Sequence, residues 1–210
     1  QFNDKKIKVI ISSAETIRIC QDKWLTYKFF RSIGINTPNT SLTADFELLK
    51  PRRGRGGKGI LENNFKKKKI DKSMISQQKI SGKEYTVDVF FQNNGKPFYI
   101  IPRLRINILD GKSTKGIVVK NNKINEQIKK ISEKISFIGP VNFQLFETKD
   151  KELLFIEINP RIAGGMALGF AASENWISLI NKNIINKKKI IPKPIKYGLQ
   201  MTRYYNECFF

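Results

Sequence analysis

The sequence of 210 residues contains no histidine and only two cysteines, Cys20 and Cys208, which lie near opposite ends of the chain. The lack of histidine excludes histidine-based catalytic triads, histidine proton shuttles and zinc sites of the usual kind. Neither cysteine has a second cysteine nearby, so we expect both to be unpaired.

Long apolar runs are missing as well. None approaches the roughly 18 residues that a membrane-spanning helix needs, and residues 1–8 are polar and charged, unlike a secretory signal. Hydrophobic residues make up 40% of the chain and aromatic residues 11%, which is enough for a packed core. We therefore expect a soluble, cytoplasmic protein with no membrane partner, of one large or two small domains.

Acidic residues are few: 18 Asp and Glu stand against 39 Lys and Arg, a formal net charge of +21. Such an excess is typical of proteins that bind nucleic acid or acidic membranes. The chain is also rich in Ile and Asn, however, so a lysine-favouring codon bias explains the excess equally well. We interpret the runs 66–69 and 187–189 as solvated loops, and we expect attraction for smaller polyanions such as a nucleoside triphosphate.

The hydrophobic pattern predicts strands and helices with few strand–helix–strand alternations, so the expected fold class is α+β. Apolar periodicity and turn signals assign the elements. Strands are expected at 7–12, 85–91, 97–101, 117–119, 141–146 and 153–158, and helices at 14–33, 125–137 and 171–180. Between Leu48 and Gly59 a further short strand is expected to run into a loop of glycines and cations. A hinge is expected near 73–83.

One candidate site is a loop rich in glycine and cations that follows the strand at Lys50. Glycines let backbone N–H groups approach an anion, and the cations supply charge, so the loop is a candidate phosphate cradle. Its basic residues are Lys50, Arg52, Arg53, Arg55 and Lys58, and its glycines include Gly56 and Gly57. It is not a P-loop, because the terminal Gly-Lys-Ser/Thr is absent. The alternative is an ordinary exposed loop.

A second candidate site combines Gln144, Glu157 and Asn159, whose side-chain oxygens suit a hard cation. If 141–146 and 153–158 pair as a hairpin, strand alternation places Glu157 on the face of Phe155, with Gln144 opposite it. A carboxylate between Ile156 and Ile158 is costly to bury unpaired. Its partner is either a metal or Arg161, and both alternatives stay open.

Several motifs in order carry a family resemblance. Asp22-Lys23 opens a helix that ends in Gly34-Ile35-x-x-Pro38, followed by Leu-Leu-Lys50-Pro and the glycine-rich loop. Then come Ser-Gly82-Lys-Glu84-Tyr-Thr-Val-Asp, Gly139-Pro-Val-Asn-Phe-Gln144 and Glu157-Ile-Asn159-Pro-Arg161. This order resembles the ATP-grasp superfamily, and within it the ligases similar to the large subunit of carbamoyl phosphate synthase.

The resemblance implies two α+β subdomains that hold ATP and Mg²⁺, or Mn²⁺, between them. It implies that Lys23 and Lys50 contact the phosphates and that the loop with Arg55, Gly56 and Gly57 covers them. The segment Gln77, Gln78, Lys79 and Ile80 would form the linking strand that reads adenine, with Glu84 near the ribose. Gln144, Glu157 and Asn159 would hold the metal, and Arg161 would stabilise an acyl phosphate.

Arg103 and Arg105 alternate on a strand and so share one face. In the context of the resemblance, both are expected to bind the carboxylate substrate or the acyl phosphate. The alternative is that they are two solvent-facing residues of an edge strand.

The resemblance also suggests a division of the chain into a remnant of an N-terminal domain at 1–22, a first subdomain at 23–80 and a second at 81–210. Relatives usually carry a whole domain before the Asp-Lys helix and a longer lid, so we expect a compact or truncated member. Gln77 stands where a glutamate that contacts ribose is common.

The leading hypothesis is an ADP-forming ligase that activates a carboxylate for attack by an amine or a similar nucleophile. Its substrates would be small molecules, and the assembly we consider is a homo-oligomer. Phosphoryl transfer needs charge neutralisation more than a proton shuttle, so the lack of histidine is no obstacle. The alternative is a non-catalytic domain that binds ATP. A nucleic-acid-binding protein rests on the net charge alone, since basic and aromatic residues do not interleave as single-strand binding requires.

Overall fold

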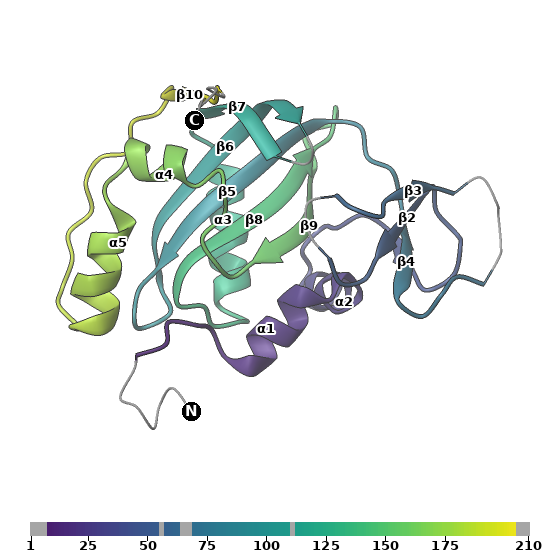
Figure 1. The fold of residues 1–210 in the computed structure, drawn as a ribbon, viewed down its shortest axis with the longest axis horizontal. Coiled ribbons are helices and arrows are strands. Elements are labelled where there is room, and N and C mark those ends of the chain that lie inside the picture. The colour runs from purple at the N-terminus through teal and green to yellow at the C-terminus, as the bar shows by residue number, and fades with distance from the viewer. Residues whose placement is uncertain (1–7, 55–56, 64–68, 110–111, 205–210) are drawn as a thin grey trace, which may run out of the picture.

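The computed structural model describes residues 8–54, 57–63, 69–109 and 112–204. Its elements are helices and antiparallel strands, which confirms the α+β prediction. They form one four-stranded and one six-stranded sheet, and the smaller sheet lies beside one end of the larger sheet (Figure 1). In the part of the chain that the structure describes, no helix is long and apolar enough to cross a membrane.

The smaller sheet has the strand order β1-β4-β2-β3, and all its pairs are antiparallel. Its strands are β1 (Thr40–Ser41), β2 (Leu48–Pro51), β3 (Leu61–Glu62) and β4 (Met74–Gln77). Helices α1 (Ala14–Gln21) and α2 (Lys23–Ser32) precede it in the chain and lie below both sheets in Figure 1.

The larger sheet has the order β10-β7-β6-β5-β8-β9. Its strands are β5 (Lys83–Phe91), β6 (Pro97–Leu109), β7 (Lys112–Val118), β8 (Gly139–Glu147), β9 (Leu153–Asn159) and β10 (Gln200–Thr202). Because side chains alternate along a strand, each strand supplies one row to either face.

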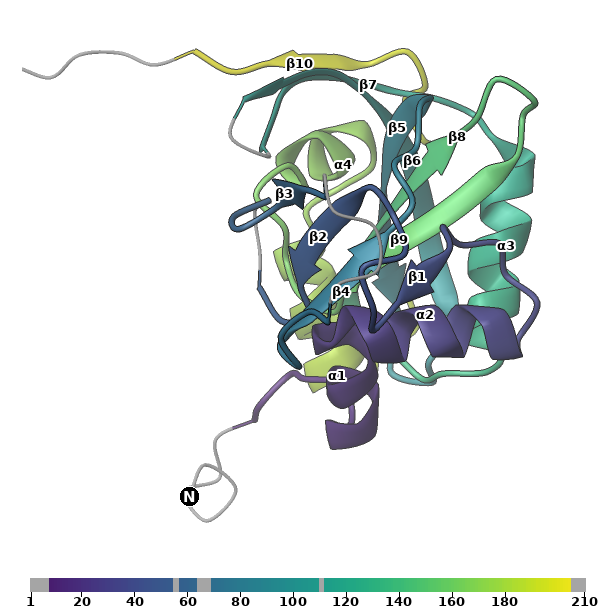
Figure 2. The same cartoon turned by 90° about the vertical axis from the view of Figure 1, so that its right-hand side faces the viewer.

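One face of this sheet packs against α2 and α3 (Asn122–Ser132), where Ile124, Ile128 and Ile131 are buried as helical periodicity predicts (Figure 2). The other face has two parts. Its far part packs around Trp176 against α4 (Ala167–Ala172) and α5 (Trp176–Leu179), which continues into the π-helix η1 (Ile180–Ile185). Its near part is open toward the smaller sheet.

The expected single helix at 14–33 is wrong, because Asp22 divides it into α1 and α2. The Asp22 side chain accepts hydrogen bonds from the backbone N–H groups of Trp24 and Leu25 and so caps the second helix. Short polar side chains compete in this way with the continuing helix. The helix at 171–180 is divided in the same manner, since Asn175 caps α5 with its side chain.

Other expected boundaries shift. The strand at 7–12 is wrong over its described part, 8–12, which is irregular, with Val9 50% and Ile11 58% exposed. The linking strand expected over Gln77–Ile80 ends at Gln77, and the chain then runs irregularly to β5. The expected hinge spans this stretch, and the division of the chain at 22 and 80 stays a prediction.

Phe30 tests the core beneath the sheet. Its side chain is fully buried, with its ring centroid 5.8 Å from that of Phe155 on β9. Phe30→Ala is expected to lower the free energy of unfolding by about 3–5 kcal/mol, through lost burial and the cavity left behind. Urea unfolding measures it. The exposed Ile177→Ala serves as the control and should change stability by less than about 0.5 kcal/mol; a similar small change for Phe30→Ala would contradict this assignment of the core.

Candidate functional site

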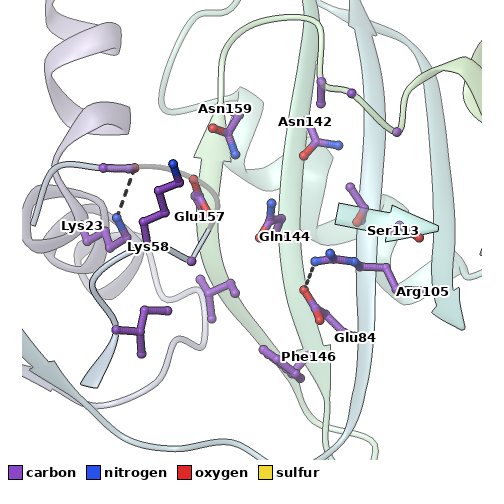
Figure 3. Close-up of a pocket in the computed structure, with 18 of the residues that line it drawn as sticks. Lys23, Lys58, Glu84, Arg105, Ser113, Asn142, Gln144, Phe146, Glu157 and Asn159 are labelled. Atoms are coloured by element: carbon purple, nitrogen blue, oxygen red, sulfur yellow. Dashed lines mark hydrogen bonds and ion pairs between the residues drawn. The ribbon is translucent and has the colours of Figure 1, made fainter. Parts of the chain in front are cut away.

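A cleft of about 570 Å³ lies between the two sheets. Both sheets and the glycine-rich loop line it, as Figure 3 shows for Lys23 and Lys58 on one side and for the β5–β9 residues on the other. A smaller compartment of about 230 Å³ shares Lys50, Gln77, Phe146 and Ile156 with it.

The floor of the cleft follows from strand register. Thr86 on β5 pairs with Arg103 on β6 and with Gln144 on β8, and Gln144 pairs with Glu157 on β9. These four residues form one row across the sheet, and all of them line the cleft. The expected placement of Gln144 opposite Glu157 is confirmed.

Glu157 does not share a face with Phe155, and that expectation is wrong. The register shifts between Gln144 and Leu145, so that Leu145 pairs with Phe155 and Ile156 is an extra residue on β9. Such a β-bulge breaks the alternation of side chains. Phe155 is therefore buried in the core, whereas Glu157 faces the cleft.

A neighbouring row adds polar groups that the sequence prediction missed. Asn142 pairs with Asn159 and with Asp88, and both asparagines line the cleft. The side chains of Asn142, Gln144, Glu157 and Asn159 lie near one another on β8 and β9 (Figure 3). Strand alternation from Gln144 is the signal that could have found Asn142.

Arg103 and Arg105 are not solvent-facing edge residues, because β6 lies between β5 and β7. The Arg103 side chain, 1% exposed, donates to both carboxylate oxygens of Asp88 over 2.5 and 2.9 Å. Asn142 donates to Asp88 over 2.8 Å. Arg105 forms an ion pair with Glu84. Both guanidinium groups line the cleft, each with a carboxylate partner.

The alternative ion pair between Glu157 and Arg161 does not form. Arg161 donates to Asn159 Oδ1 over 3.1 Å and to the Ile162 carbonyl over 3.2 Å. Among the described residues, the Glu157 carboxylate has neither a hydrogen bond nor an ion pair within 4.0 Å. Glu157 thus presents its carboxylate to the cleft.

Lys50 on β2 faces the floor from the smaller sheet. Its Nζ donates over 2.8 Å to Gln77 Oε1, and Gln77 in turn donates to Thr40 over 3.0 Å. Burial lowers the pKa of the Lys50 ammonium and the positive charge of Lys23 lowers it further, while Glu157 and Glu84 act in the opposite direction. The buried Gln77 holds Lys50 in place.

Lys23, at the start of α2, lies beside the loop and donates to the Gly54 carbonyl over 3.5 Å (Figure 3). Gly57 and Lys58 also line the cleft. Arg55 and Gly56 lie outside the described residues. The loop begins at Arg52, which forms an ion pair with the buried Asp22 over 2.6 Å and so ties the loop to α2.

The smaller compartment is mostly apolar. Leu48, Ile80, Phe146 and Ile156 line it together with Gln78 and Lys79 of the linking segment. Lys79 also forms an exposed ion pair with Glu62 over 2.7 Å.

The structure thus brings together most of the described site residues that the sequence predicted. The exceptions are Arg52 and Arg53 of the loop, which form ion pairs with Asp22 and are not among the residues that line the cleft. It adds Thr86, Asn142 and Arg203 to the lining of the cleft, and Asp88 as the ion-pair partner of Arg103. Three lysines at one end suit a polyanion. The described residues contain no group of three or more Asp, Glu, Cys or His that could hold a metal by themselves.

The Asp22–Arg52 ion pair predicts a pH dependence. Burial would raise the pKa of Asp22, but the hydrogen bond and charge of Arg52, together with the backbone N–H groups of Leu25 and Trp24, outweigh it and lower that pKa. The stabilisation is therefore present above the unfolded-state pKa of about 3.9 and is lost as the pH falls through the folded-state pKa. Asp22→Asn keeps a helix cap and should cost roughly 1–3 kcal/mol at neutral pH.

The difference between wild type and Asp22→Asn should shrink toward zero as the pH falls from about 7 to about 2, measured by urea unfolding. Asp150→Asn, at an exposed turn, is the matched control. A difference for Asp22→Asn that is constant over this range would show that the ion pair does not stabilise the fold.

A model of the ATP-grasp domain family matches residues 20–165, which is more than half of the chain. The match spans α2, the loop, the smaller sheet, strands β5 to β9 of the larger sheet and the cleft floor up to Gly165. A search of curated proteins finds no match.

Solved structures share the fold at low identity. Biotin carboxylase from Campylobacter jejuni, as a β,γ-ATP complex, is 16% identical with a TM-score of 0.75, covering 94% of this chain and 53% of that one. The biotin carboxylase domain of Hydrogenobacter thermophilus 2-oxoglutarate carboxylase, with MgADP, ADP and bicarbonate, is 14% identical with a TM-score of 0.72, and the match covers 95% of this chain and 53% of that one. An L-amino acid ligase from Bacillus licheniformis is 17% identical with a TM-score of 0.65, and the match covers 92% of this chain and 52% of that one.

The chain spans about half the length of each of these proteins. The family match, the fold and the order of the motifs agree: the chain belongs to the ATP-grasp family.

Proposed function

We propose that the cleft binds Mg·ATP and uses it to activate a carboxylate as an acyl phosphate, which an amine or a similar nucleophile then attacks. The observation that carries the proposal is the Glu157 carboxylate, which has no cationic partner among the described residues and faces Lys50 and Lys23 across the cleft. The family membership supports ATP as the phosphoryl donor.

The nucleotide is proposed to lie with its base in the apolar compartment. Leu48, Phe146 and Ile156 would contact the base, and the backbone of Gln77, Gln78, Lys79 and Ile80 would read its edge. Glu84 would lie near the ribose. Lys23 and Lys50 would contact the phosphates, and the loop with Arg55, Gly56 and Gly57 would cover them.

The donor set fits Mg²⁺, or Mn²⁺, that arrives with a nucleotide. Magnesium is usually held by one or two carboxylates together with substrate phosphates. Glu157 supplies the carboxylate, and Gln144 and Asn159 supply amide oxygens beside it. When bound, the metal would neutralise phosphate charge. With one free carboxylate in this set, binding of metal without nucleotide is expected to be weak.

The remaining roles are electrostatic. Attack of a carboxylate on the γ-phosphoryl group spreads negative charge over the transferred group, and positioned cations stabilise it. Arg161 and Arg103 are proposed to bind the reacting carboxylate or the acyl phosphate, and Arg105 is proposed to assist them from the same wall. Asp88 keeps the Arg103 guanidinium rigid.

The class of substrates follows from the same comparisons. The similar structures include an L-amino acid ligase and a complex with bicarbonate, which supports a carboxylate and an amine or similar nucleophile as small-molecule substrates. The specific likeness to the large subunit of carbamoyl phosphate synthase, and a homo-oligomeric state, stay predictions.

Glu157→Gln tests the proposal. Thermal melting is measured with ATP, with Mg²⁺ and with both. ATP and Mg²⁺ together should stabilise the wild-type protein by about 2.7 kcal/mol at a hundredfold excess over the dissociation constant, whereas Mg²⁺ alone should not stabilise it. In Glu157→Gln the magnesium-dependent part should disappear, and ADP release with acids and amines should fall by about 100-fold or more.

Glu133→Gln, an exposed carboxylate at the end of α3, should behave as wild type. Absence of any nucleotide shift in wild type would refute the proposal. A nucleotide shift without ADP release would identify the non-catalytic alternative instead.

A further inference from the structure

Four arginines from separate elements line the cleft. Arg103 and Arg105 come from β6, Arg161 follows β9, and Arg203 follows β10. Arg203 lies 38 positions beyond the family match, which ends at residue 165. It therefore reaches the cleft through a segment that the family model does not describe.

The position of Arg203 is set by strand pairing and not by a free tail. Gln200, Met201 and Thr202 pair with Ile117, Gly116 and Lys115 of β7. The Arg203 backbone N–H then donates to the Thr114 carbonyl over 2.8 Å. Its guanidinium donates to the Gly164 carbonyl, in the loop that follows Arg161.

These four arginines differ in how their charge is neutralised. Arg103 has Asp88 and Arg105 has Glu84 as a carboxylate partner. The hydrogen bonds of Arg161 and Arg203 go to carbonyl and amide oxygens only. Within the described ranges, neither forms an ion pair with Asp or Glu. Among the described residues, these two positive charges thus have no carboxylate partner.

The loop with Gly164 and Gly165, which follows Arg161 and contacts Arg203, leaves room for an anion. A Cβ added at Gly164 would meet nothing within 4 Å, so open space lies beside this backbone. A Cβ added at Gly165 would lie 3.1 Å from a guanidinium nitrogen of Arg103. The glycines therefore keep the wall open at one position and let Arg103 approach at the other.

We propose that Arg203 is a specificity residue that binds a second anionic group of the acid substrate, so that the substrate is a dicarboxylic or a phosphorylated acid. This inference rests on the proposed function of the cleft. One anionic group of the acid reacts beside Arg161, and the other meets Arg203. Guanidinium groups bind carboxylates and phosphates alike through paired N–H donors, so both kinds of second group share the same chemistry.

Matched probes test the inference on the whole chain. Glutarate is compared with glutaramate, and phosphoserine with serine, each pair differing in one anionic group. Binding is measured as a melting shift in the presence of Mg·ADP. In wild type, at least one dianionic acid should bind about tenfold or more tightly than its partner, because an arginine–anion pair contributes about 1.5–3 kcal/mol. A difference between glutarate and glutaramate would identify the second group as a carboxylate, and a difference between phosphoserine and serine would identify it as a phosphate.

Arg203→Gln should remove this discrimination while the melting shift with Mg·ATP stays unchanged, and Arg203→Lys should keep part of it. Arg31→Gln, on an exposed helix end outside the cleft, should match wild type. Equal affinities within both pairs, no binding of any acid, or discrimination that survives in Arg203→Gln would each overturn the inference. If Mg·ATP produced no melting shift in the wild-type protein, the proposed function would be refuted instead. Failure of the proposed function is therefore distinguishable from failure of the inference about Arg203.

Discussion

The β-bulge between β8 and β9 is the constraint on which the site depends. If β9 ran through Ile156 as a regular strand without the bulge, side-chain alternation would place Phe155, Glu157 and Asn159 on one face. Either the core would lose Phe155, or the cleft would lose Glu157 and Asn159. The bulge lets one seven-residue strand serve both. It also directs Ile156 to both compartments of the cleft. The apolar compartment and the carboxylate thus come from consecutive residues of β9.

The buried pair of Asp88 and Arg103 gives this floor its rigidity. A buried ion pair adds little net stability, because desolvation offsets the attraction, but removal of one partner costs about 3–5 kcal/mol. Asn142 satisfies one oxygen of Asp88, and Gly165 allows the close approach of Arg103. The network therefore holds a guanidinium at the wall of the cleft in one orientation. An enzyme that acts by positioned charge needs such preorganisation.

Local patterns predicted much of this architecture. The isoleucines of α3 follow helical periodicity, and the strands β8 and β9 pair as their sequences indicate, with Gln144 opposite Glu157. Strand pairing and motif order therefore located the cleft. Single-residue events escaped prediction because they depend on neighbours distant in the chain. Asp22 ends one helix and caps the next while it binds Arg52, and the bulge at Ile156 is set by the competing demands of core and cleft.

The sequence did not predict Arg203 as a site residue for a related reason. Its position also shows how the net charge of +21 should be interpreted. Nothing in the local sequence of residues 200–203 indicates a site, since only the pairing of β10 with β7 brings this arginine to the cleft. The total charge says little about partners, but its arrangement says more. Lys23, Lys50 and Lys58 gather at the nucleotide end, and Arg161 and Arg203 gather at the other. Between them stands the Glu157 carboxylate. A cleft with cations at both ends and a carboxylate in the middle is suited to two anions brought together around a metal. For this chain, the position of each charge relative to the strands is thus more informative than its total.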